Sequence, residues 1–373
     1  MPNFRYVVDI GSGLGHLPNS IARRLINDTN GCCSQKDNVS QMESVGNADS
    51  NNSFKPVCVI AVECNESMHI KACRSIDKTL QDNGVAELGL QHIERLLFRV
   101  EASDLDKLKS EITTAFLRRQ RVTDEESVEP SAPPDYLVCG LHCCGDLGPS
   151  VIRLFNSHQQ ARSLLLVGCC YHKMALDTFP MSPLLREAMS QLVQLGTSLI
   201  TESTFRLACQ WSPCSWFTWC ARDFNKHRLQ FVGRTLLSHL QRHSKKSVIT
   251  KERKSRRKNP SEIVGIKQLL DNPNLAFAQI LPLLLAELCT ELELDSEEML
   301  SIIPATELEH LWTLTPGILA IQQLLQPLLE ALILADRVWA VRSATGDGCY
   351  AGLVRLFEPH VSPRCIALVA CRK

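Results

Sequence analysis

The sequence has no excess charge of either sign, because 40 Lys and Arg residues balance 40 Asp and Glu residues among its 373 positions. A net charge of zero provides no overall attraction to nucleic acid or to anionic lipid, so such contacts would need a local patch. The sequence also lacks a run of eighteen uninterrupted apolar residues. The nearest candidates, 275–289 and 314–335, contain Gln, Glu or Pro, and we interpret both as buried helices. No membrane partner is expected.

A signal-peptide pattern and an internal repeat are missing as well. Cysteine, in contrast, is abundant: the 17 residues include adjacent pairs at 32–33, 143–144 and 169–170. An odd number of cysteines in a long chain without a leader is typical of a reducing compartment. The sequence therefore predicts an intracellular protein, cytoplasmic or nuclear, in which most thiols pack as small apolar side chains.

Short apolar runs alternate with helical patterns through the first half of the chain. Strands are predicted at 4–10, 57–63, 92–105, 135–148 and 163–172, and helices at 17–26 and 67–80. This alternation predicts an α/β fold, a mostly parallel Rossmann-like sheet with helices on both faces. Residues 27–56 are rich in Asn, Ser and Gly and predict a disordered insertion, and 122–135 predict a polar, Pro-rich loop.

The second half of the chain changes character. Residues 184–245 and 262–340 have helical patterns, and the second of these segments is rich in Leu. Residues 352–373 predict two strands joined by a Pro-bounded turn. We therefore expect a core at 1–222, a helical insertion at 223–328 with a basic linker at 242–258, and a return to the core through a helix and strand pair at 329–373.

The stretch VVDIGSGLGHL, residues 7–17, places three glycines between the first strand and the first helix. Gly11, Gly13 and Gly15 allow the backbone to approach a ligand, and the helix that follows offers free N–H groups. Dinucleotide folds favour G-x-G-x-x-G at this point. Here the spacing is G-x-G-x-G, and Asp9 precedes it. An acid at that position suits a ligand with a cationic or donor-rich group, such as the amino-acid end of S-adenosylmethionine, although a tight turn without a ligand is the simpler alternative.

An acid at the end of the second strand would hold the ribose of such a ligand, and Glu63 occupies that position. Glu63 lies further along the chain than a compact unit requires, and the insertion at 27–56 explains the extra length. Glu101 and Asp104, which follow the third predicted strand, are candidates for the adenine contact. The predicted cofactor-binding residues are therefore Asp9, Gly11, Gly13, Gly15, Glu63 and Asp104.

Several of these segments resemble a known family. VDIGSGLGHL, GLHCCGDLG, VGCCYHKM, FRLACQ and LFEPHVSPRCIALVA are similar to segments of the methyltransferase-like twenty-five family, also called ribosomal RNA adenine dimethylase domain-containing. The resemblance implies a class I methyltransferase sheet whose last strand is antiparallel, S-adenosyl-L-methionine as cofactor, and RNA as acceptor. Members of that family usually carry a helical region before the glycine turn, and we expect this chain to be without it. A non-catalytic scaffold that binds protein partners through its helical region is therefore the alternative.

The turns after the fourth and fifth predicted strands carry a second resemblance. LHCCG and CCYH are similar to motifs of the tRNA acceptor-stem ribose methylases, and Tyr171 departs from their pattern. The resemblance implies methylation of rRNA or tRNA. The matching residues are His142, Cys144, Gly145, Cys169, Cys170 and His172.

Both turns are expected at the carboxyl ends of neighbouring strands, where open parallel sheets bind ligands. We predict His142, Asp146, Tyr171 and His172 as catalytic residues, with either histidine able to take a proton from a ribose hydroxyl. The sequence has no Asp/Asn-Pro-Pro-Tyr turn after the fourth strand, which weakens methylation of an adenine amine. Covalent attack by cysteine on a pyrimidine is also disfavoured, because no Pro adjoins these cysteines.

The same turns contain soft metal ligands: His142, Cys144, Cys169, Cys170 and His172. Their spacing matches no recognised zinc knuckle, so we interpret the cysteines as packing residues and expect no metal. A dinucleotide oxidoreductase is disfavoured by Asp9 and by the glycine spacing.

Two further features are ambiguous in the sequence. Trp211, Trp216 and Trp219 could stack on unpaired bases, but such a cluster is more often part of a core. The basic run at 245–258 could contact phosphates or serve nuclear import, and a solvated loop is an equal alternative.

Overall fold

The computed structural model describes residues 5–31, 57–83, 92–123, 133–196, 200–210, 216–243, 269–292 and 296–373. The chain divides into two compact units: Met1–Cys209 together with Leu328–Lys373, and Gln210–Pro327. The first division therefore falls at Cys209 rather than at residue 222. Within the second unit, Trp216 stacks on Trp219 with ring centroids 5.6 Å apart and meets Phe224 edge-on.

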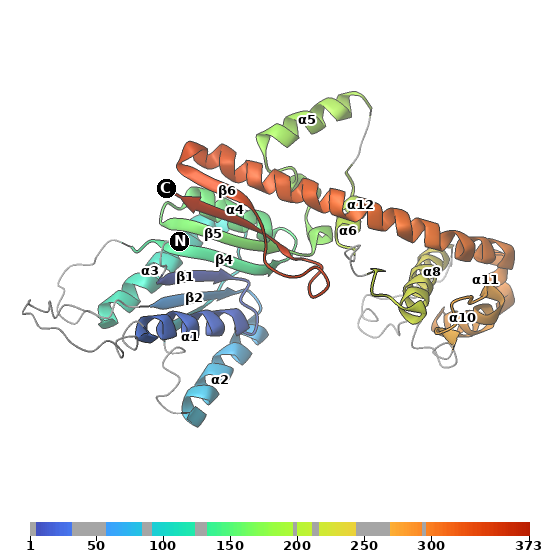
Figure 1. The fold of residues 1–373 in the computed structure, drawn as a ribbon, viewed down its shortest axis with the longest axis horizontal. Helices are drawn as coiled ribbons and strands as arrows, with labels where there is room; N and C mark the ends of the chain where they lie inside the picture. The colour runs from blue at the N-terminus through green and yellow to red at the C-terminus, as the bar shows by residue number, and fades with distance from the viewer. Residues whose placement is uncertain are drawn as a thin grey trace, which may run out of the picture. The chain divides into compact units, whose positions relative to one another are not determined.

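The first unit is built on a seven-stranded sheet with the order β3-β2-β1-β4-β5-β7-β6 (Figure 1). The first five strands pair in parallel, and β7 pairs antiparallel with both β5 and β6. The strands are β1 (Tyr6–Ile10), β2 (Cys58–Glu63), β3 (Ile93–Leu97), β4 (Tyr136–Cys143), β5 (Ala161–Gly168), β6 (Cys349–Arg355) and β7 (Ile366–Arg372). This arrangement confirms the predicted α/β, Rossmann-like class with antiparallel last strands.

Helices cover both faces of the sheet. On one face, α3 (Leu105–Thr123), α4 (Leu147–Ser157) and the end of α12 (Ala305–Thr345) bury apolar side chains against the strands. On the other face, α1 (His16–Gly31) and α2 (Glu66–Asn83) pack on β1, β2 and β3. Strands covered on both sides are mostly apolar, which explains the buried Val, Ile and Ala residues that precede the acids Asp9 and Glu63 in β1 and β2.

The position of β1 in the sheet determines where the candidate site forms. This strand lies between β2 and β4, with Val8 in register with both Ile60 and Val138. Helices that follow β1 and β4 therefore lie on opposite faces of the sheet, and a crevice forms at the carboxyl ends of these two strands. The fold thus places the residues after β1, β2 and β4 around one opening.

The third strand is shorter than predicted. β3 ends at Leu97, and Phe98 donates its N–H to the backbone oxygen of Glu63 at 2.9 Å. The chain then turns through η3 (Ala102–Asp104), a short 3-10 helix begun by the hydrogen bond from the Asp104 N–H to the Glu101 oxygen. The prediction of a strand over 92–105 was therefore wrong beyond Leu97.

Short helices complete the first unit: η4 (Tyr171–Lys173), η5 (Leu176–Thr178), α5 (Pro183–Gln194), α6 (Glu202–Ala208) and η8 (Gly346–Gly348). α5 is anchored at its start by the buried Asp336, whose carboxylate accepts hydrogen bonds from the N–H of Met181 and from both the N–H and the hydroxyl of Ser182, at 2.6–2.8 Å. This contact joins the segment after β5 to the end of α12.

The second unit is helical, as the pattern of residues predicts. It contains α8 (Ala221–His243), α10 (Phe277–Leu292), α11 (Ser296–Ile302) and the beginning of α12, packed around Leu229, Ile280 and Leu284. Burial of Ile280 and Leu284 confirms the prediction of a buried helix at 275–289. In the same unit, the Arg228 guanidinium lies over the Trp312 ring, 3.8 Å from its centroid.

The long helix at 314–335 is less buried than predicted. The segment Ala305–Gly348 is long and apolar enough to cross a membrane by length and composition alone, and 28% of its most apolar window is buried. Leu324 and Leu328 are 72% and 66% exposed. The helix itself is confirmed, but its burial is partial, and its interpretation as a non-membrane helix stays a prediction.

Three predicted segments lie wholly or largely outside the described residues. α1 continues to Gly31, so the first five positions of the predicted insertion at 27–56 are helical and the rest lies outside. Most of the predicted loop at 122–135 and the basic run at 245–258 also lie outside, as does Trp211.

Candidate cofactor site

The glycine bend after β1 is tied to the end of β2. Gly11, Gly13 and Gly15 all have positive φ, at 78°, 55° and 85°, which side chains other than glycine adopt only with strain. The N–H groups of Gly11 and Ser12 donate to the backbone oxygen of Val62 at 2.9 and 3.0 Å. The bend is therefore a fixed structure rather than a loose loop.

Glu63 lies directly against this bend. Its carboxylate is buried, and its two oxygens accept hydrogen bonds at 2.8 Å from the N–H of Gly13 and from the N–H of Asn65. Asn65 in turn accepts a hydrogen bond from Met68 and caps α2. The spacing of the two strands predicted that Glu63 would face the glycine turn, and its hydrogen bond to Gly13 places it there.

The bend is open at its centre and covered at one end. A Cβ added at Gly13 would meet no atom within 4 Å, whereas one added at Gly15 would run into the guanidinium of Arg95. The Ser12 hydroxyl is buried and has no hydrogen-bond partner among the residues that the structure describes. A backbone with open space at Gly13 and an unused hydroxyl beside it fits a ligand that supplies polar groups.

Asp9 lies beneath the bend and is 2% exposed. Burial raises the pKa of its carboxyl to about 7, and the nearby charge of Arg95 and the hydrogen bond from the Cys139 thiol oppose this rise. The thiol sulfur lies 3.7 Å from the carboxylate oxygen. Asp9 does not line the cavity described next, so it adjoins the bend from the core side.

A cavity of about 600 Å³ opens at the carboxyl ends of β1 to β4. This volume is within the range of sites that hold small-molecule ligands. Its wall combines the bend, the segment after β3, the turn after β4 and the start of α4. The lining residues are Gly11, Val62, Cys64, Phe98, Arg99, Val100, Glu101, Ala102, Cys144, Asp146, Leu147, Ser150, Arg153, Ala175, Asp177 and Thr178.

Asp146 is the predicted catalytic residue that lines this cavity. One of its carboxylate oxygens accepts hydrogen bonds from the N–H of Ala175 at 3.0 Å and from the hydroxyl of Thr178 at 2.7 Å. The side chain thereby fixes the segment after β5 against the turn after β4. Asp146 is partly exposed, so the geometry suits a residue that shapes the wall.

The other predicted catalytic residues do not line the cavity. His142 is exposed and adopts a left-handed backbone with φ of 62°. His172 points its Nδ1 at the Cys209 sulfur, 3.5 Å away, and burial lowers its pKa. Of the two residues proposed for the adenine contact, Glu101 lines the cavity and Asp104 does not.

Tyr171, which the sequence predicts as a catalytic residue, lies in the core and not in the wall of the cavity. Tyr171 is 2% exposed, and its hydroxyl donates to the carboxylate of Glu330 at 3.3 Å. The guanidinium groups of Arg337 and Arg364 lie 5.2 and 6.0 Å from its ring centroid, and Arg364 also pairs with Glu330. Tyr171 is the first residue of the 3-10 turn η4, and its ring packs against side chains of α12.

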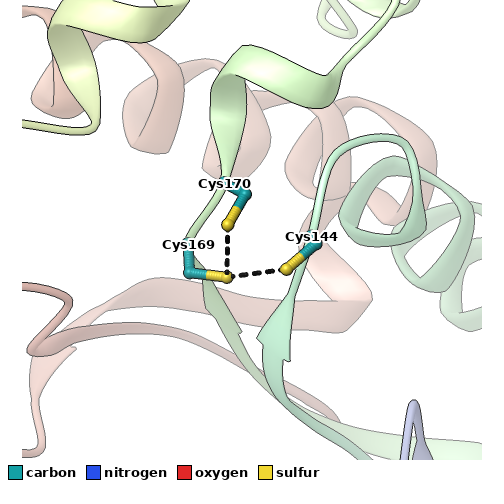
Figure 2. A group of neighbouring side chains, drawn as sticks. All are labelled: Cys144, Cys169 and Cys170. Atoms are coloured by element: carbon teal, nitrogen blue, oxygen red, sulfur yellow. Dashed lines mark hydrogen bonds between the residues drawn. The ribbon is translucent and has the colours of Figure 1, made fainter. Parts of the chain in front are cut away.

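The cysteines of the two turns meet at the edge of the cavity. Figure 2 shows Cys144, Cys169 and Cys170 converging, with sulfur–sulfur distances of 3.1 Å between Cys144 and Cys169 and 3.6 Å between Cys169 and Cys170. Burial raises the pKa of the Cys144 thiol. In the sequence, these three cysteines form a set of candidate metal ligands together with His142 and His172. The structure brings the three sulfurs together without either histidine.

Several residues of the cavity wall were not predicted from the sequence. Phe98, Arg99 and Val100 were assigned to a strand, although the polar run that follows them indicates a turn. Ser150 and Arg153 lie four and seven residues after Asp146, the N-cap of α4. This helical spacing in the sequence indicates that the three residues lie on the same side of the helix.

Comparison with known proteins agrees with this geometry. Residues 2–177 match the family described as a methyltransferase domain. The first half of the chain is therefore similar to a methyltransferase domain, and the sheet that it builds has the Rossmann-like arrangement of strands.

Among individual proteins, the chain is similar to the probable methyltransferase-like protein 25 of Homo sapiens, with 27% identity over 269 residues. It is also similar to the Mus musculus protein of the same name, with 26% identity over 268 residues. These matches cover 64% of this chain and 37% and 38% of the two relatives, so the chain spans less than two fifths of their length. The resemblance to methyltransferase-like proteins is therefore confirmed, whereas the rRNA dimethylase and tRNA ribose methylase assignments stay predictions.

Proposed function

We propose that this protein is an S-adenosylmethionine-dependent methyltransferase that acts on RNA. The observation that carries the proposal is the contact of the buried Glu63 carboxylate with the N–H of Gly13, beside a cavity at the carboxyl ends of β1 to β4. This is the location where open α/β sheets bind nucleotides. The match of residues 2–177 to a methyltransferase domain supports the same class of reaction.

The residues around the cavity fit such a cofactor. The open backbone at Gly13 and the unused Ser12 hydroxyl offer polar contacts for its amino-acid end, and Glu63 offers a carboxylate for the ribose hydroxyls. Phe98 and Val100 provide apolar surface for a base, with Glu101 beside them as acceptor for an exocyclic amine. The bound cofactor would supply an electrophilic methyl group.

The chain's own task is then to position the acceptor and exclude water. Asp146 fixes the segment at Ala175 and Thr178, which closes one side of the cavity. Arg99 and Arg153 line the cavity as well, and their charges suit a phosphate-bearing acceptor. These arginines and the resemblance of the two Cys/His turns to RNA-modifying enzymes support RNA as the acceptor class.

The experiment has two stages, both with the full chain. Isothermal titration with S-adenosylmethionine tests cofactor binding, with Glu63→Gln as the weakened variant. Incubation with methyl-labelled cofactor and total cellular RNA or total protein, followed by fractionation, identifies the acceptor. Absence of binding overturns the cofactor assignment, and label in protein but not in RNA overturns the acceptor class.

A second candidate is a non-catalytic scaffold that binds protein partners. The exposed Leu324 and Leu328 of α12 favour it, because exposed leucines on one helix are typical of interaction surfaces. This candidate predicts that Asp9→Ala leaves partner binding unchanged. We also propose an intracellular location, supported by thirteen described cysteines that are all free thiols.

A further inference from the structure

The turns after β4 and β5 bring three sulfurs to one point at the edge of the cavity. Cys144 approaches from the turn after β4, and Cys169 and Cys170 approach from the end of β5 (Figure 2). All three sulfurs lie within 4.8 Å of one another. This convergence comes from two segments of different strands, so it is not a consequence of sequence adjacency alone.

The backbone holds the two turns together independently of the sulfurs. Gly145 donates its N–H to the oxygen of Cys170 at 3.2 Å, and Lys173 donates to the same oxygen at 3.0 Å. Gly145 has a φ of 57°, and a Cβ there would lie 2.7 Å from the Lys173 oxygen. The turns are therefore packed backbone against backbone, which fixes the positions from which the three thiols project.

The sulfur spacing suits ligands of one cation. Two thiolates around a tetrahedral zinc ion, each about 2.3 Å from the metal, lie roughly 3.8 Å apart. The observed separations of 3.1 and 3.6 Å are shorter than this value, and small rotations of the side chains would bring the three sulfurs, which all lie within 4.8 Å of one another, to ligand spacing. The Cys144 and Cys169 thiols share a hydrogen bond in the absence of metal, and a bound ion would take the place of its proton.

We propose that Cys144, Cys169 and Cys170 bind one zinc ion through their sulfurs, with a water molecule as the fourth ligand. Each thiol gives its proton to solvent when the metal binds, which leaves one net negative charge on the ion and its three thiolates. The side-chain charge of Lys173 acts on Cys144 and offsets part of this charge. This proposal replaces the expectation that these cysteines only pack.

The position of the ion follows from the wall of the cavity. Cys144 lines the cavity, so the metal would lie at its edge and close to the turn that carries Asp146. Cys209 donates its thiol to the backbone oxygen of Cys169 at 3.4 Å and thereby supports the turn without joining the three sulfurs. The zinc site needs neither the cofactor nor an acceptor and is independent of the proposed function.

The test is the metal content of the full chain purified after expression in zinc-supplemented medium. Elemental analysis is expected to find one zinc ion per chain in the wild type and to find it lost in Cys144→Ser, Cys169→Ser and Cys170→Ser. Cys371→Ser is the matched control, because Cys371 is a half-buried free thiol on β7, and it is expected to retain the metal. Circular dichroism of each variant checks that loss of metal is not loss of fold.

Cobalt provides a measurement that does not depend on the variants. Wild-type protein loaded with Co²⁺ is expected to show the sulfur-to-cobalt charge-transfer absorption of thiolate ligands, which zinc then displaces. A wild type that takes up neither metal overturns the proposal. So does a mass two hydrogens lower than expected with Cys144 linked to Cys169, because a disulfide would then explain the short sulfur–sulfur distance.

Discussion

The carboxylate of Glu63 accepts a hydrogen bond from the backbone N–H of Gly13 across 2.8 Å, and this contact joins the end of β2 to the bend after β1. A second hydrogen bond from Asn65 holds the other oxygen. One side chain thus fixes the shape of the bend, next to Val62 and Cys64, which line the cavity. Several consequences of this arrangement can be measured.

Replacing Glu63 with Gln is expected to weaken both the fold and cofactor binding. The carboxylate accepts from two N–H donors, and an amide would have to turn its own N–H₂ group toward one of them. We expect a loss of about 1–3 kcal/mol in the free energy of unfolding, measured by urea denaturation, and about a tenfold weaker affinity for S-adenosylmethionine by titration calorimetry. Glu66→Gln is the matched control, because Glu66 is exposed. Equal effects of the two substitutions would contradict this role of Glu63.

Gly145 is expected to be far less tolerant of a side chain than Gly346. Both have positive φ, at 57° and 59°, so replacement with Ala costs about 1–2 kcal/mol of backbone strain at each. A Cβ at Gly145 would also lie 2.7 Å from the Lys173 oxygen, whereas one at Gly346 meets nothing within 4 Å. Thermal denaturation should therefore show a clearly larger decrease in Tm for Gly145→Ala. A similar decrease for both would mean that the turns after β4 and β5 are not packed as described.

Asp9 is expected to make stability depend on pH. Burial raises the pKa of its carboxyl from 3.8 to about 7 in the folded protein. The folded chain keeps the proton over a range where the unfolded chain has released it, so stability falls as pH rises from about 4 to about 7.

Asp9→Asn removes this titrating carboxyl and should make the stability less dependent on pH. Relative to the variant, the wild type is expected to lose up to about 4 kcal/mol across that range, measured by urea denaturation at several pH values. Parallel curves for the two proteins would show that Asp9 is charged in the fold.

Tyr171→Phe is expected to affect stability and leave cofactor binding unchanged. The substitution removes the hydrogen bond from the hydroxyl to Glu330, at a cost of about 1 kcal/mol. Tyr350→Phe, on the exposed face of β6, is the control and should change neither property. A large loss of affinity for S-adenosylmethionine in Tyr171→Phe would show that Tyr171 belongs to the cofactor site.

The sequence was sufficient for the parts of the site that depend on local pattern. Apolar β-branched runs ending in Gly or Glu predicted β1 and β2, and the spacing of Asp9 and Glu63 predicted that the acid faces the bend. These inferences succeed because a buried parallel strand has a distinctive composition and its carboxyl end has a defined position in the sheet.

The sequence was insufficient where distant segments decide the orientation of a side chain. Tyr171 lies just after β5, where a catalytic residue is expected. Its side chain instead contacts Glu330 and Arg337 of α12 in the core. The wall at Phe98 and Arg99 was missed because the end of β3 depends on a hydrogen bond to Glu63 in a neighbouring strand. The contacts of Tyr171 leave no local pattern, whereas the polar run after Val100 is a local signal for the end of β3.

The placement of β7 between β5 and β6 has a consequence for the order in which the molecule assembles during translation. The outer edge of β5 receives its partner from residues 366–372, after the ribosome has made the whole of the second unit. An uncovered strand edge invites pairing with other chains. The outer edge of β5 therefore stays without its β7 partner from the synthesis of residue 168 until residues 366–372 have been made.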